Sequence, residues 1–141
     1  MKLRTVIDTN VLVSGLKSRH GASFRILSLV GTGVFDHCVS VGLLFEYEAT
    51  LKRPGLLRGF TVRQLDDFLD YFVGSAQRLE IFYLWRPVLR DPGDDLVLEV
   101  AVTGSCSSIV TFNKRDFEQS EKFGIAVLAP QEFLAQLEKS T

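Results

Sequence analysis

The sequence has few of the residues from which proteins build disulfide frameworks and zinc sites. Its 141 residues include two cysteines, Cys38 and Cys106, which are far apart in the chain and form no CxxC motif. The two histidines, His20 and His37, are equally isolated, and we expect one in a loop and one in a strand. This scarcity argues against a disulfide scaffold and against a zinc site, and we expect both thiols to be reduced core residues.

Excess charge and long apolar runs are missing as well. The formal net charge is −1, so any attraction to a polyanion has to come from a local patch of cations. The apolar runs are far shorter than the ~20 residues that cross a bilayer, and the N-terminus has no signal-peptide pattern. We therefore expect a soluble, cytoplasmic protein with no membrane partner.

What the chain contains is an alternation of strand-like and helix-like segments. Hydrophobic residues make up 46% of the sequence and charged residues 23%, as in globular proteins. Strand patterns cover residues 2–7, 34–40, 107–112 and 124–130, and helix patterns cover residues 21–33, 41–55, 61–76, 90–106 and 131–140. The apolar run 79–84 has no certain place in the sheet. The alternation predicts one α/β domain over residues 1–141, with three α/β/α layers and a mainly parallel central sheet.

Polar residues interrupt the first apolar run, in the stretch VIDTNVLVS. Asp8, Thr9 and Asn10 separate the strand-like residues up to Ile7 from a helical spacing that begins at Val11. An aspartate at such a junction often caps the helix by accepting a backbone N–H bond. The alternative is that Asp8 stands at the carboxyl end of a central strand, where open α/β sheets place their sites.

Two predicted helices bring further acids towards the same edge of the sheet. In LLFEYEATLKRP, Glu46 falls beside the apolar stripe, where an unpaired charge is costly, although an ordinary surface acid is the alternative. In DPGDDLVLEVA, Asp91 suits the N-cap, and Asp94 lies on the helix face that meets the sheet. Asp95 is rotated by about 100° and should be solvated. Complementing the helix dipole is the alternative role for these helix-start acids.

The stretch IVTFNKRDF adds a fourth acid. A strand ending at Thr111 leads to Asn113 and Asp116, again at the carboxyl edge, although a turn with an N-cap would also explain them. Four carboxylates meeting at one edge would repel one another and raise their pKa values. A hard divalent cation with oxygen ligands, Mg²⁺ or Mn²⁺, resolves this conflict. We therefore interpret Asp8 as part of a metal site.

These four stretches resemble, in order and spacing, the PIN-domain ribonucleases, and in particular the VapC-type toxins of toxin–antitoxin systems. The resemblance spans about residues 3–134. It implies a metal-dependent endoribonuclease that hydrolyses RNA phosphodiester bonds with an acidic quartet at Asp8, Glu46, Asp94 and Asp116. Asp8, Asp94 and Asp116 would bind the Mg²⁺ or Mn²⁺ cofactor, and Glu46 would orient the attacking water. The resemblance also implies a homodimer and an antitoxin partner.

Further residues are expected to support such a site or to contact its substrate. Expected supports for the acids are Thr9, Asn10, Thr111 and Asn113. Cations near the motif ends, which would position RNA or else be ordinary surface charges, are Lys17, Arg19, Lys52, Arg53, Lys114 and Arg115.

Two residues depart from the family pattern. Relatives often carry an acid where this chain has Gly93, and Asn113 leaves Asp116 to supply the fourth charge.

Two other functions are compatible with the sequence, and one apolar surface has two possible roles. A non-catalytic PIN-fold regulatory or RNA-binding module is the runner-up. Phosphoryl transfer with Asp8 as nucleophile is disfavoured, because Asn10 stands where the usual aspartate phosphatase has a second Asp.

The broad apolar stripe of the helix at 61–76 would either form a homodimer interface or pack on the domain's own core. Its members are Val62, Leu65, Phe68, Leu69, Phe72 and Val73.

Overall fold

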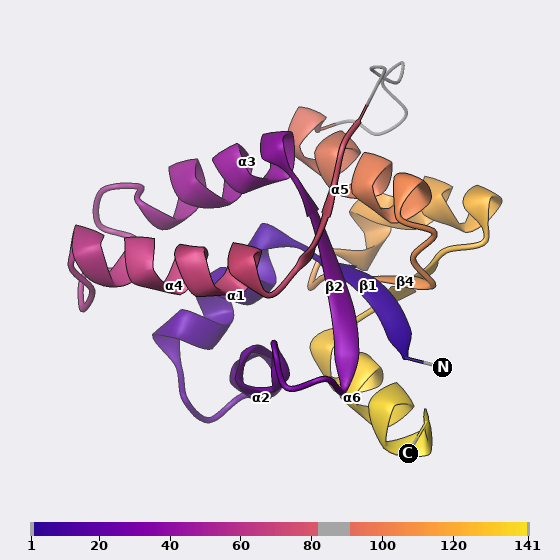
Figure 1. Cartoon of the computed structure of the whole chain (residues 1–141), viewed down its shortest axis with the longest axis horizontal. Coiled ribbons are helices and arrows are strands. Elements are labelled where there is room, and N and C mark those ends of the chain that lie inside the picture. The colour runs from indigo at the N-terminus through magenta and orange to yellow at the C-terminus, as the bar shows by residue number, and fades with distance from the viewer. Residues whose placement is uncertain (1, 82–90, 141) are drawn as a thin grey trace.

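Five parallel strands form one sheet in the order β3-β2-β1-β4-β5 (Figure 1). The computed structural model describes residues 2–81 and 91–140. The strands are β1 (Leu3–Ile7), β2 (Phe35–Ser40), β3 (Gln77–Leu79), β4 (Ser108–Val110) and β5 (Ala126–Leu128). The parallel sheet is as predicted, except that the edge strand β3 meets the apolar run 79–84 only at Leu79; residues 82–84 lie outside the described ranges.

In the described ranges, six α-helices and one 3₁₀ helix flank the sheet. They are α1 (Thr9–Lys17), α2 (Ala22–Leu29), α3 (Val41–Leu51), α4 (Val62–Gly74), α5 (Pro92–Thr103), the 3₁₀ helix η1 (Lys114–Phe123) and α6 (Pro130–Ser140). α3 packs against α5, and α2 packs against both α1 and α6 (Figure 1). The predicted three-layer α/β/α architecture is confirmed. None of the helices in the described ranges has the length and apolar character needed to span a membrane.

Two helices end earlier than their sequence patterns suggest. α2 ends at Leu29, and the turn after it contains Gly31 with a φ of +79°. A β-carbon at Gly31 would collide with the hydroxyl of Tyr71, which donates a hydrogen bond to the Val30 carbonyl at 3.0 Å. Glycine is therefore required there both by backbone conformation and by the close approach of α4. α3 likewise ends at Leu51, before Pro54 could break it.

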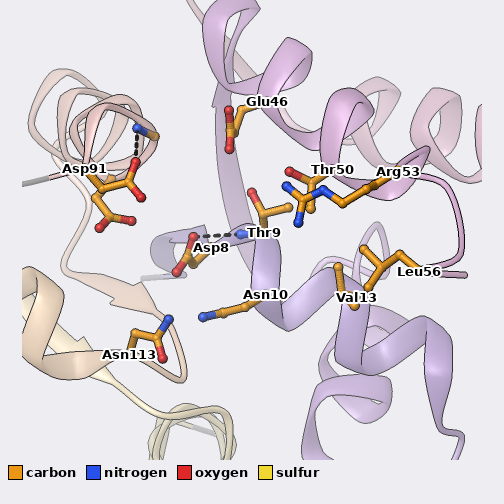
Figure 2. A pocket seen from close by; sticks show the side chains of 12 residues that line it. Asp8, Thr9, Asn10, Val13, Glu46, Thr50, Arg53, Leu56, Asp91 and Asn113 are labelled. Atoms are coloured by element: carbon orange, nitrogen blue, oxygen red, sulfur yellow. Dashed lines mark hydrogen bonds between the residues drawn. The ribbon is translucent and has the colours of Figure 1, made fainter.

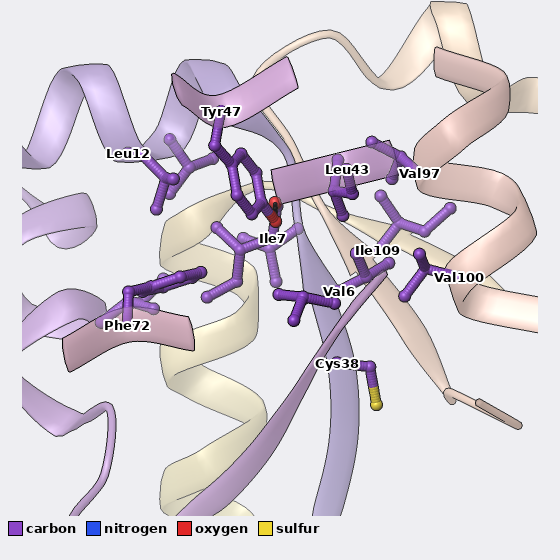
Figure 3. Packing of buried hydrophobic residues seen from close by; sticks show 14 of the residues in the cluster. Val6, Ile7, Leu12, Cys38, Leu43, Tyr47, Phe72, Val97, Val100 and Ile109 are labelled. Carbon is purple, nitrogen blue, oxygen red and sulfur yellow. Dashed lines mark hydrogen bonds between the residues drawn. The ribbon is translucent and has the colours of Figure 1, made fainter. Parts of the chain in front are cut away.

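A buried tyrosine fixes α3 against the end of β1. Tyr47 is fully buried, and its hydroxyl donates a 2.6 Å hydrogen bond to the Ile7 carbonyl (Figure 3). Burial raises the pKa of Tyr47 well above its ordinary value, so the hydroxyl stays protonated and able to donate. Glu46, its neighbour in α3, is thereby held at a defined place relative to the strand that leads to Asp8.

The remaining core bears out the expectations for cysteine and histidine. Cys38 and Cys106 are both free and buried. His37 lies in β2, and its Nε2 is 2.6 Å from the Phe72 carbonyl, while His20 lies exposed outside the helices and strands. Burial lowers the pKa of His37, so the neutral imidazole donates this bond.

The apolar stripe of α4 faces largely inward. Leu65, Leu69 and Phe72 are buried in the core, whereas Phe68 and Val73 are half-buried. Val62 remains 62% exposed. Most of the stripe is therefore used by the domain's own core, and the homodimer stays a prediction.

A candidate acidic site at the carboxyl edge of the sheet

The strand order reverses beside β1. The chain places β2 and β3 on one side of β1, and β4 and β5 on the other. Asp8 directly follows β1, and its backbone N–H donates to the Val110 carbonyl at the end of β4 at 2.9 Å. Crevices at such switch points are the usual ligand sites of open α/β sheets. Asp8 and Thr111, the residues that follow β1 and β4, therefore lie where a ligand of this fold would bind.

Both oxygens of the Asp8 carboxylate are engaged by the protein. Oδ1 accepts a 2.8 Å bond from the Thr9 backbone N–H, and Oδ2 accepts a 2.7 Å bond from the Thr111 hydroxyl. The side chain is nearly buried, and burial raises its pKa, although these two bonds counteract the rise. The nearby charges of Asp116 and Asp91 raise the pKa further. Asp8 is the N-cap of α1, so the capping interpretation is correct as well as the position at the strand end.

A pocket of about 390 Å³ opens in front of Asp8 (Figure 2). Its walls are formed by Asp8, Thr9, Asn10, Val13, Glu46, Thr50, Arg53, Leu56, Asp91, Gly93, Asp94 and Asn113. Three acids of the predicted quartet thus line one pocket, and they come from three different segments, the start of α1, α3 and α5. Asn10, Thr9 and Asn113, predicted as supports, line it too.

Asp91 is an additional acid in this pocket. It caps α5 as predicted, accepting a 2.8 Å bond from the Gly93 backbone N–H, but its carboxylate also lines the pocket. A β-carbon at Gly93 would lie 3.1 Å from Glu46 Oε1 and 3.2 Å from Asp91 Oδ1. Glycine at this position therefore lets Glu46 approach the start of α5 closely. The missing acid at Gly93 does not leave the pocket short of carboxylates, because Asp91 supplies one.

Asp94 has a strongly raised pKa. Its pKa is raised from 3.8 to about 7, first by burial and then by the charges of Asp8, Asp91, Asp116 and Asp95. It stands on the face of α5 whose next turns, at Leu98 and Ala101, are fully buried, as predicted. Asp95 is half-buried rather than fully solvated.

Asp116, the fourth predicted acid, is exposed in the first turn of η1. It lines a second pocket, of about 480 Å³, together with Asp91, Pro92 and Asp94. The two pockets share Asp91 and Asp94, and the charge of Asp116 acts on both Asp8 and Asp94. Asp116 therefore interacts electrostatically with Asp8 and Asp94 but stands beside the first pocket instead of lining it.

The predicted polar supports form a short hydrogen-bonded chain. Thr111 is fully buried and accepts a 3.0 Å bond from the Asn113 backbone N–H while donating to Asp8. Asn10 Oδ1 accepts a 3.4 Å bond from the Phe112 backbone N–H. These contacts tie the start of α1 to the segment after β4 and fix the orientation of Asp8.

The predicted RNA-positioning cations separate into different environments. Arg53 lines the first pocket. Lys52 pairs with Glu48 at 3.4 Å and with Asp66 of α4, and Lys114 pairs with Glu132 at 2.8 Å. The other three, Lys17, Arg19 and Arg115, are exposed and do not line the pocket.

The carboxylates are close enough to repel but do not form a compact cage. Within residues 2–81 and 91–140, no group of three or more His, Cys, Asp or Glu side chains has the spacing to hold a metal ion. A cation at this edge would therefore take part of its coordination from water or a bound ligand.

A family model described as the PIN domain matches residues 4–115, most of the chain. The protein belongs to the PIN-domain family. The match includes Asp8, Glu46 and Asp94 and ends one residue before Asp116. Among solved structures, the chain is similar to VapBC2 from Rickettsia felis bound to a DNA fragment from their promoter, with a TM-score of 0.59 and 14% identity over 90% of this chain and 98% of that one. That likeness establishes a shared fold. No curated protein sequence matches this PIN-domain chain.

Proposed function

We propose that this PIN-domain protein is a metal-dependent endoribonuclease and the toxin of a toxin–antitoxin system. The observation that carries the proposal is the pocket at the switch point, where Asp8, Glu46 and Asp94 converge. Two of these acids, Asp8 and Asp94, have raised pKa values. Clustered acids with perturbed pKa values in a cleft are typical of functional sites.

The donor set fits Mg²⁺ or Mn²⁺ chemically. The pocket offers carboxylate, amide and hydroxyl oxygens, and its acids repel one another in the absence of a cation. Asp8 and Asp94, with Asp116 beside them, would hold the ion. When bound, it would lower the pKa of a water molecule and screen charge on the phosphate. A site without three clustered protein ligands agrees with this role, since Mg²⁺ is often held by one or two carboxylates and completed by water and phosphate.

The protein's own residues would orient the reaction. Thr9 and Thr111 hold the Asp8 carboxylate in one orientation, and each of its oxygens has a second lone pair that could bind a cation. Glu46, placed on α3 next to the anchored Tyr47, would accept a hydrogen bond from the attacking water and turn that water towards phosphorus.

The toxin assignment rests on the resemblance of the four motifs to VapC-type toxins. The fold shared with the Rickettsia felis structure agrees with it. The toxin assignment also implies a cytoplasmic location, a homodimer and an antitoxin partner. Co-expression of the chain with its genomic neighbour, followed by co-purification, tests the partner directly.

A non-catalytic RNA-binding module with the same fold is the competing function. Incubation of the purified protein with single-stranded RNA in Mg²⁺, Mn²⁺ or EDTA separates the two. We expect cleavage that requires a divalent cation and disappears in Asp8→Asn, whose side-chain oxygen can still accept the Thr9 bond. Glu118→Gln, which removes an exposed acid of η1 outside both pockets, is the control. RNA binding without cleavage under every condition would favour the module.

A further inference from the structure

Arg53 has a position that the other cations of the described ranges lack. Among the residues that the structure describes, it is the only Lys or Arg that lines the acidic pocket. Its side chain extends from the segment after α3 towards Thr50 and Thr9 (Figure 2). The guanidinium therefore shares a cavity with four carboxylates, those of Asp8, Glu46, Asp91 and Asp94.

Arg53 is also available for a ligand. Its neighbour Lys52 is held by Glu48 and Asp66, an arrangement that connects the end of α3 to α4. Arg53 makes no ion pair within the described ranges, not even with the acids of its own pocket. Among the described residues, no acceptor is bound by the Arg53 guanidinium, which has five N–H donors to offer to a ligand.

The pocket has two unlike ends. The carboxylates of Asp91 and Asp8 lie towards one side, and Arg53 lies towards the other, beside Leu56 and Val13 (Figure 2). An RNA strand that reached the acids would be repelled by them unless a cation faced its phosphates. The planar guanidinium donates two parallel bonds to a phosphate, which a lysine ammonium cannot match geometrically.

We propose that Arg53 binds a non-bridging phosphate oxygen of the RNA and so positions the strand across the acidic end of the pocket. This inference rests on the proposed ribonuclease function and adds to it a substrate-binding residue. Val13 and Leu56 would then border the ribose next to that phosphate. The ribose is polar at its hydroxyl groups and has an apolar face that could pack on these two side chains.

Arg53→Ala, Arg53→Lys and Arg63→Ala test the inference. Arg63 is exposed on α4, lies outside the pocket and makes no ion pair in the described part of the chain, so it controls for the loss of one positive charge. We expect Arg53→Ala to raise the KM for single-stranded RNA at least about 10-fold, because each lost charge-assisted hydrogen bond weakens binding by about one order of magnitude. Its plot of log affinity against log salt should be shallower by about 0.7, the contribution of one phosphate contact on a single strand. Arg53→Lys should keep the slope and lose part of the affinity, and Arg63→Ala should change neither.

Anisotropy of a fluorescent single-stranded RNA, measured in EDTA, separates this inference from the proposed nuclease activity. RNA cleavage with an unchanged KM and salt slope in Arg53→Ala would overturn the role of Arg53 and leave the nuclease intact. RNA binding without cleavage would overturn the nuclease, and the shallower slope of Arg53→Ala would still support phosphate binding. A protein that neither binds nor cleaves RNA would overturn both.

Discussion

Replacing Asp94 by asparagine should stabilise the protein in metal-free buffer. Asp94 is partly buried and faces the charges of Asp8, Asp91, Asp116 and Asp95, so its folded carboxyl has a pKa of about 7 instead of 3.8. The folded state therefore binds a proton at Asp94 more tightly than the unfolded chain does. Above pH 7 the ionised carboxylate destabilises the fold, and this cost falls as the pH drops from 7 towards 4.

The size of the effect follows from the shift in pKa. A difference of about three pKa units corresponds to ~4 kcal/mol at most, since each unit is about 1.4 kcal/mol. Asp94 lines two open pockets, so solvent screens part of this energy, and we expect a gain of about 1–2 kcal/mol in the free energy of unfolding at pH 8. For a chain of this length the midpoint should rise by roughly 3–8 °C.

Thermal unfolding followed by circular dichroism in EDTA at pH 8 and pH 4.5 measures the difference between variant and wild type. The gain should be present at pH 8 and nearly absent at pH 4.5, and Mg²⁺ should stabilise the wild type more than Asp94→Asn. Asp95→Asn, in the same turn of α5 but outside both pockets, is the control and should gain less. A variant that is less stable at pH 8 would refute the electrostatic account and favour a dipole role for Asp94. A gain of equal size at both pH values would also refute the electrostatic account, because the effect would then not depend on ionisation of the carboxyl.

Three other changes test the surroundings of the site. Thr111→Val removes the hydroxyl that donates to Asp8 and accepts from Asn113, and it should cost about 1.5–3 kcal/mol in urea unfolding; Thr111→Ser should restore most of it, and no loss would mean that this bond does not hold Asp8. Gly93→Ala places a β-carbon 3.1 Å from Glu46 Oε1, so we expect slower RNA cleavage with stability changed by less than about 1 kcal/mol; full activity would show that Glu46 need not stay in place. Light scattering at micromolar concentration should detect the homodimer, and a strictly monomeric protein would contradict it.

The sheet could be predicted because its central strands have local signals. β1, β2 and β4 are short runs rich in buried apolar residues; the polar residues Asp8 and Thr111 follow β1 and β4, and β2 ends at Ser40. β3 has no such signal, because Gln77 and Arg78 are exposed on a strand that, in the described part of the chain, pairs with β2 alone. Its place depends on backbone pairing, which the side-chain pattern does not encode.

The acids could be predicted because topology brings strand ends together. Asp8 and Thr111 follow parallel neighbours, and the helical spacing of Asp94 above Leu98 orients it towards the sheet. The exposed position of Asp116 could not be predicted in the same way, since η1 is a 3₁₀ helix and the stretch NKRD is equally typical of a turn. The i,i+4 spacing of Glu48 and Lys52 predicts the ion pair between them, which is present at 3.4 Å. The Lys52–Asp66 pair could not be predicted, because Lys52 meets Asp66 only when α4 folds beside α3.

Capping and site formation are compatible roles for Asp8 and Asp91, although the sequence presents them as alternatives. The Thr9 and Thr111 bonds engage both oxygens of Asp8, and a carboxylate oxygen has a second lone pair available for another partner. Asp91 likewise caps α5 through Oδ1 while its carboxylate lines both pockets. The cap therefore gives each carboxylate a fixed orientation before any cation or phosphate arrives. The cost of burying Asp8 is offset in part by the same two bonds, and this is how the fold keeps mutually repelling acids beside one another.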